Sequence, residues 1–155
     1  MNITIASLEQ TEKLAAACAK ILRPGTVIAL NGELGAGKTT FTKALVRASG
    51  GKDTATSPTF VLLNIYQGGL YPVYHFDFYR LASLADLENI GGPEFIPPPS
   101  GVAVIEWAEK IPDILPADHI SVNIAVEDEE RRIFSFSFLG QTQFLQKELE
   151  RQWLS

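Results

Sequence analysis

The order of apolar and polar positions predicts an α/β protein with two kinds of strand. Short, continuous apolar runs at residues 27–30 and 102–105 are typical of strands buried on both faces of a parallel sheet. Two pairs of further β-rich segments, each joined by a turn, predict β-hairpins. These are residues 59–66 with 70–79, and residues 120–126 with 133–138. The sheet should therefore be mixed, with one hairpin inserted after the helix predicted at residues 39–48 and one near the C-terminus.

Helical periodicity fills most of the chain between these strands. Apolar residues recur at helical spacing in residues 8–22, 39–48, 81–90 and 142–154. Ser7 is a candidate N-cap of the first helix, and Leu84 and Leu87 should face the core from the third. Residues 91–101 hold four prolines and indicate a loop. Strands, helices and a length of 155 residues together predict one domain over residues 1–155, with helices flanking the sheet.

A phosphate-binding motif stands between the first buried strand and the second helix. Residues 32–39 read GELGAGKT, which fits the pattern G-x-x-x-x-G-K-[ST] of P-loop proteins. The alternative is a chance match on a Gly-rich turn. A strand directly before the motif and a helix directly after it are the context that the pattern requires, and both are predicted here.

The residue types of this loop suit a triphosphate. Gly35 and Gly37 permit positive φ and the close approach of backbone N–H groups to phosphate oxygens, and the helix N-terminus adds its dipole. Lys38 should reach the β- and γ-phosphates, and Thr39 should offer its hydroxyl to Mg²⁺. The expected nucleotide-binding residues are Gly32, Glu33, Leu34, Gly35, Ala36, Gly37, Lys38, Thr39 and Thr40.

Charge and composition narrow the class further. The net charge of −5 argues against a basic surface that grips nucleic acid unaided, although a partner could hold RNA. No apolar run approaches the ~20 residues of a membrane span, and the first residues show no secretory signal. The single cysteine, Cys18, shares a helical face with apolar residues, which predicts a core thiol. A cytoplasmic, reducing location fits these features.

Two acidic residues stand where metal binding and catalysis are expected. Glu106 follows the apolar run of residues 102–105 and ends it at the position of a Walker B carboxylate, which holds Mg²⁺ directly or through water. A solvated glutamate at a strand end is the alternative. Asp77 shares one strand face with His75 and could orient the attacking water or bind the outer shell of the metal. His75 could equally be a structural residue.

Two other groups of hydroxyl residues have open roles. The stretch of Ser57, Pro58 and Thr59 could sense a γ-phosphate or could only form a turn. Ser7 and Thr11 could touch an adenine base, although capping or surface exposure is the simpler interpretation.

Four motifs, in this order, resemble those of the TsaE (YjeE) family of small bacterial P-loop ATPases. They are GELGAGKTTF from Gly32, SPTF from Ser57, HFDFYR from His75 and VIEW from Val104. Phe78 replaces the leucine of the family's HxDLYR, an apolar exchange. Residues 91–101, with three consecutive prolines, are unlike the family pattern and leave any partner contact there open.

The resemblance implies a fold, a function and site roles. It implies a P-loop NTPase-like fold with ATP in the loop of residues 32–40, Mg²⁺ on Thr39 and Glu106, and Asp77 and Lys38 serving hydrolysis. It also implies a weak ATPase that works with TsaD and TsaB in t6A37 modification of tRNA. TsaD would carry out the threonylcarbamoyl transfer, and tRNA would be reached through the complex.

A small-molecule kinase with the same loop is the alternative function. A kinase would need an acceptor pocket and an arginine-bearing lid, yet the chain has only 13 lysines and arginines and no Arg-rich insertion. A nucleotide-gated binding module without turnover is a third interpretation.

Overall fold

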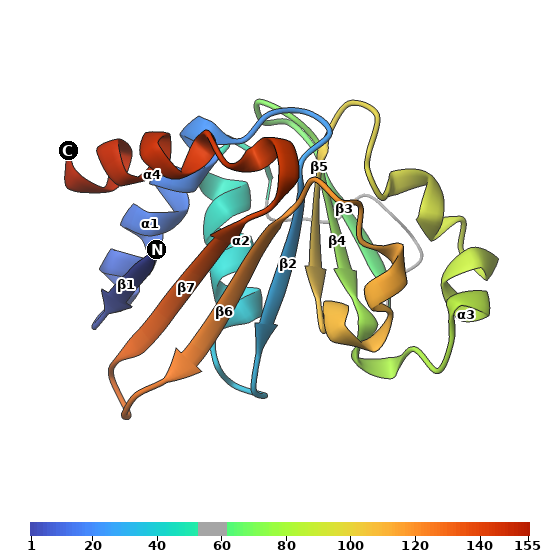
Figure 1. Ribbon diagram of the computed structural model, residues 1–155, viewed down its shortest axis with the longest axis horizontal. Coiled ribbons are helices and arrows are strands. Elements are labelled where there is room, and N and C mark those ends of the chain that lie inside the picture. Colours follow the sequence, from blue (N-terminus) through green and yellow to red (C-terminus); the bar gives the residue numbers. More distant parts are fainter. Residues whose placement is uncertain (53–61) are drawn as a thin grey trace.

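A mixed sheet forms the centre of the computed structural model, which describes residues 1–52 and 62–155. Within these residues seven strands are arranged in the order β1-β7-β6-β2-β5-β4-β3 (Figure 1). The strands are β1 (Asn2–Ile5), β2 (Val27–Gly32), β3 (Leu63–Tyr66), β4 (Val73–Asp77), β5 (Val102–Glu106), β6 (Ile120–Val126) and β7 (Arg132–Phe138).

Strand direction confirms the predicted mixture. The inner strands β6, β2, β5 and β4 run parallel to one another, whereas β3 pairs antiparallel with β4 at one edge. At the other edge β7 lies antiparallel between β6 and β1. Both expected hairpins are therefore present. The first part of the segment predicted at residues 59–66, together with Ser57, Pro58 and Thr59, lies outside the described residues.

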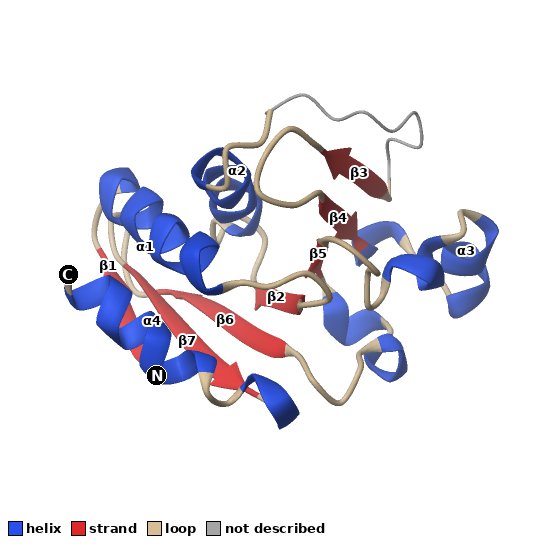
Figure 2. Ribbon diagram, turned by 90° about the horizontal axis from the view of Figure 1, so that it is seen from above, coloured by secondary structure: helices blue, strands red, loops and turns tan. Residues whose placement is uncertain are grey.

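Helices α1 (Leu8–Ile21), α2 (Lys38–Ala48) and α4 (Leu145–Leu154) pack around one face of the sheet, while α3 (Leu84–Asn89) is short and lies apart. Figure 2 shows α1 between α2 and α4, and helix α1 contacts both of these helices. Ser7 caps α1 as predicted, since its hydroxyl accepts from the Gln10 N–H at 3.1 Å. None of the helices in the described part of the chain is both long and apolar enough to cross a bilayer.

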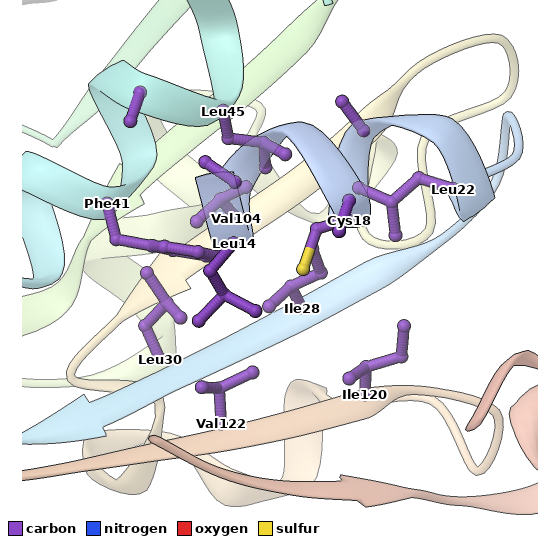
Figure 3. Close-up of a cluster of buried hydrophobic side chains, with 14 of the residues drawn as sticks. Leu14, Cys18, Leu22, Ile28, Leu30, Phe41, Leu45, Val104, Ile120 and Val122 are labelled. Carbon is purple, nitrogen blue, oxygen red and sulfur yellow. The ribbon is translucent and has the colours of Figure 1, made fainter. Parts of the chain in front are cut away.

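Side chains that alternate along the strands pack into two apolar layers, one on each face of the sheet. Ile28 and Leu30 of β2 face α1 and α2, while Val27 and Ala29 face the opposite layer. Figure 3 shows the first layer, in which side chains of α1 and α2 interlock above the sheet. Cys18 belongs to it and is 4% exposed, which confirms the predicted core thiol. Burial raises the pKa of this thiol to about 12.

Three predicted elements are shorter than the sequence pattern indicates. Strand β4 ends at Asp77 because the Asp77 carboxylate accepts from the Tyr79 N–H at 3.0 Å and starts a 3₁₀ turn, Phe78–Arg80. Helix α3 begins at Leu84, which is 42% exposed, so the prediction that Leu84 faces the core is wrong. Leu87 is buried, as predicted. Helix α4 begins at Leu145, after a 3₁₀ turn at Gly140–Thr142.

Candidate functional site

The loop between β2 and α2 curls at the carboxyl edge of the sheet. Gly35 has φ 81°, and Gly37, which is the N-cap of α2, has φ 106°. A Cβ on either residue would meet no atom within 4 Å, so backbone conformation rather than space requires glycine there. This curl brings successive backbone N–H groups to the start of α2, where the helix dipole is positive.

Gly32 has a positive φ of 155°, and a lack of space is a second reason for glycine there. A Cβ at this residue would lie 2.7 Å from the carbonyl oxygen of Ile124 in β6 and 3.2 Å from the Cβ of Ala36. The start of the loop is therefore pressed between the neighbouring strand and its own later turn. Ala36 itself is buried, which anchors the loop on the core.

Lys38 is a buried cation, with only 5% of its surface exposed. Its Nζ donates to the carbonyl oxygens of Gly32 at 2.5 Å and Glu33 at 3.0 Å, and it lies 4.3 Å from the ring centroid of Trp107. Among the described residues, no carboxylate forms an ion pair with it. The positive charge is thus held in the loop without being neutralised, which favours an anionic ligand.

Glu106 meets the start of α2. Parallel pairing of β5 with β2 places Glu106 opposite Leu30, beside the strand that leads into the loop. Glu106 is buried, with 3% of the residue exposed, and its two carboxylate oxygens lie 3.0 and 3.1 Å from the Thr39 hydroxyl. The two predicted metal ligands are therefore adjacent, although they stand far apart in the sequence.

The hairpin strand β4 supplies two more side chains to the same place. Asp77 lies opposite Glu106 in the β4–β5 register, and it lines a pocket of about 250 Å³ together with Lys38, Thr39 and Thr40. His75 is buried and hydrogen-bonds to Glu106, a contact that the sequence pattern left open.

A second pocket of about 250 Å³ opens on the other side of the loop, between α1 and β7. Ser7, Thr11, Thr40 and Arg132 are among the residues that line it. Ser7 and Thr11 are also engaged in the first turn of α1, since the Thr11 hydroxyl donates to the Ser7 carbonyl at 3.3 Å. The capping role expected for Ser7 is thus present, and both residues still border the loop.

Trp107, the last residue of the VIEW motif, and Arg132, which belongs to no motif, both reach the site. Trp107 directly follows β5, has φ 59°, and carries its ring over Lys38. Tyr79 packs on the same ring, with centroids 5.1 Å apart. A left-handed tryptophan is uncommon, and its conformation turns the chain sharply at the site. Arg132 reaches the loop only because β7 folds back beside β6.

The donor set fits magnesium better than a tightly caged metal. Mg²⁺ is bound through one or two protein oxygens together with phosphate and water. The Thr39 hydroxyl and the Glu106 carboxylate can provide those protein oxygens. In the part of the chain that the structure describes, no three His, Cys, Asp or Glu residues gather in a way that could hold a metal ion. Phosphate oxygens would therefore have to complete the coordination.

These features define a class. A parallel sheet core, a glycine-rich loop that leads from a strand into a helix, and an acidic residue at the end of the adjacent strand are those of a P-loop NTPase-like α/β protein. The family profile described as "Threonylcarbamoyl adenosine biosynthesis protein TsaE" matches residues 5–134. The chain belongs to the TsaE family.

Known proteins resemble this chain over most of its length. The tRNA threonylcarbamoyladenosine biosynthesis protein TsaE of Bacillus subtilis is 35% identical over 144 residues, covering 92% of this chain and 89% of that protein. Its namesake in Treponema pallidum is 40% identical over 126 residues, covering 81% and 92%. The crystal structure of Bacillus subtilis YdiB superimposes with a TM-score of 0.78 and 31% identity, covering 97% of this chain and 94% of that one.

Proposed function

We propose that this protein binds Mg²⁺–ATP and hydrolyses it as an accessory factor in the formation of threonylcarbamoyladenosine on tRNA, acting with TsaD and TsaB. Membership of the TsaE family supports the pathway. The observation that carries the chemistry is the contact of the Thr39 hydroxyl with the Glu106 carboxylate, beside the unneutralised ammonium of Lys38.

In this proposal the loop binds the phosphates. The N–H groups of residues 33–39 and the positive end of α2 would surround the β-phosphate, and Lys38 would exchange its two carbonyl acceptors for phosphate oxygens. Thr40 lines the pockets on both sides of the loop and would contact the α-phosphate. The ribose and base would then lie toward the pocket that Ser7, Thr11 and Arg132 border.

Thr39 and Glu106 would hold the magnesium ion, which neutralises charge on the phosphate oxygens when bound. Asp77 lies beside Glu106 in the register and would orient the attacking water. One of its oxygens already accepts from the Tyr79 N–H, which fixes the direction of the other.

The arrangement favours weak activity without a partner. No arginine of the described residues lines the pocket that Lys38, Thr39 and Asp77 share. P-loop enzymes commonly stabilise the transition state with an arginine, which a second protein can supply. The net charge of −5 also makes direct tRNA binding unfavourable, so RNA would be held by the partner complex.

ATP turnover measured with and without TsaB–TsaD tests the proposal. We expect stimulation by the complex, with phosphate and ADP released in equal amounts. ADP formed without phosphate release when candidate acceptors are present would instead indicate a kinase. In reconstituted tRNA modification, Lys38→Ala should abolish the product, whereas Lys20→Ala, an exposed lysine in the last turn of α1, should not. Intact modification with Lys38→Ala would overturn the proposal.

A further inference from the structure

His75 of β4 contacts Glu106 of the neighbouring strand β5. In the parallel pairing of β4 with β5, His75 lies opposite Val104 and Asp77 lies opposite Glu106. Since strand side chains alternate, His75, Asp77 and Glu106 all point to the face that carries α2. The side chains of His75 and Glu106 are only 6% and 4% exposed, and both line one pocket with Thr39 and Asp77.

The Glu106 carboxylate is held from two directions. The Thr39 hydroxyl, from the first turn of α2, lies 3.0 and 3.1 Å from the two carboxylate oxygens. The Nε2 of His75, from the inserted hairpin, forms a hydrogen bond with Oε2. A buried carboxylate with fewer donors would be costly, and its long side chain would be less defined.

The imidazole is itself oriented. Its ring lies beside the ring of Tyr66 in β3, with centroids 6.3 Å apart and planes at 29°. The Nδ1 atom of His75 is buried and has no hydrogen-bond partner within residues 1–52 and 62–155. A hydrogen on Nε2 and a bare Nδ1 is therefore the tautomer that satisfies the contacts of the described residues, since Nε2 then donates to the carboxylate.

We propose that His75 is a positioning residue for Glu106. It acts through the carboxylate rather than on the nucleotide, and it sets the direction of the Glu106 oxygens before magnesium arrives. Such outer partners of metal-binding carboxylates affect metal affinity strongly because they remove the freedom of the ligand to turn away. This inference rests on the proposed function, and it assigns the inserted hairpin a part in metal binding.

Calorimetry of ADP binding in EDTA and in Mg²⁺ tests the inference without requiring turnover. In His75→Leu, which keeps the bulk but removes the donor, we expect the Mg²⁺-dependent gain in affinity to fall by about tenfold or more. Affinity in EDTA should stay within about twofold, because the loop itself is untouched. His75→Gln should restore most of the gain, since its amide N–H can stand near the position of Nε2.

The comparison of variants separates positioning from folding. If His75→Leu unfolds, His75→Asn takes its place, because its shorter amide falls short of Glu106 and should show the same loss. An unchanged Mg²⁺ gain in either folded variant, or an equal loss in EDTA and in Mg²⁺, would overturn the inference and leave the proposed function standing. A wild-type protein with no Mg²⁺ gain would overturn both.

Discussion

Replacing Lys38 by methionine removes one charge from the candidate site and keeps the apolar stem of the side chain. In the structure the Lys38 ammonium donates to the carbonyl oxygens of Gly32 and Glu33 and lies 4.3 Å from the ring centroid of Trp107. The variant should bind Mg²⁺–ADP more weakly, because the phosphates lose a charged donor. The free energy lost depends on what the ammonium gives up when a nucleotide arrives.

The size of the loss follows from these contacts. A hydrogen bond to a charged group contributes about 1.5–3 kcal/mol. Lys38 must leave two carbonyl acceptors to reach phosphate, so the net value should be at the low end, about 1.5–2 kcal/mol. Since a difference of about 1.4 kcal/mol is tenfold in Kd, affinity should fall by roughly 10- to 30-fold. Stability should change little, because the substitution removes a buried charge together with its bonds.

Titration calorimetry with Mg²⁺–ADP gives the two dissociation constants, and thermal unfolding shows whether the variant is folded. Lys20→Met, at an exposed position of α1, is the matched control and should bind as the wild type does. A folded Lys38→Met variant with unchanged affinity would show that the ammonium does not serve phosphate binding.

Three further predictions concern the loop and the core. Gly32→Ala should cost about 1–3 kcal/mol of stability through the 2.7 Å approach of its Cβ to the Ile124 oxygen together with its φ of 155°. Gly35→Ala should cost about 1–2 kcal/mol through its positive φ alone. Gly35→Asn should therefore recover stability in urea unfolding, and no such recovery would contradict this account. Phe41→Ala should cost about 3–5 kcal/mol because the ring is buried against Phe134, while Phe144→Ala, at a 59% exposed position, should stay within about 0.5 kcal/mol. The pKa of Cys18 is raised from 9.0 to about 12, so its stabilising effect is complete below pH 9 and is lost as pH rises toward 12. Urea unfolding should show a slope of at most about 1.4 kcal/mol per pH unit from this thiol, absent in Cys18→Ala, and equal slopes would refute it.

Local pattern predicted the elements of the fold, and tertiary contacts decided where they end. The apolar runs in β2 and β5 and the alternation in β6 and β7 are strong periodic signals, and each strand is present. The end of β4 depends on one hydrogen bond, from the backbone N–H of Tyr79 to the side chain of Asp77, which strand propensity does not reveal. Leu84 has the spacing of a core residue but lies in the first turn of a short helix that leaves it exposed.

The site could be predicted as far as its motifs reach. The loop, Thr39 and Glu106 follow from spacing and from the rule that strand ends gather at one edge of a parallel sheet. The contact of His75 with Glu106 depends on the β4–β5 register, and a shift of one residue would have turned His75 to the other face. Trp107 lies in the VIEW motif, but its left-handed backbone was not predicted, and Arg132 reaches the site through strand pairing that no local pattern encodes.

The close approach of the Ile124 backbone to Gly32 has a consequence for protein synthesis. Ile124 belongs to a strand that leaves the ribosome long after the glycine-rich motif has emerged. Strand β1, made first, finds its neighbour only when Phe134 and the rest of β7 are made. Pairings between residues far apart in the sequence form slowly, because the entropy of loop closure is lost before the contacts stabilise the fold. A nascent polypeptide would thus carry the complete glycine-rich motif before the strand beside Gly32 has been made.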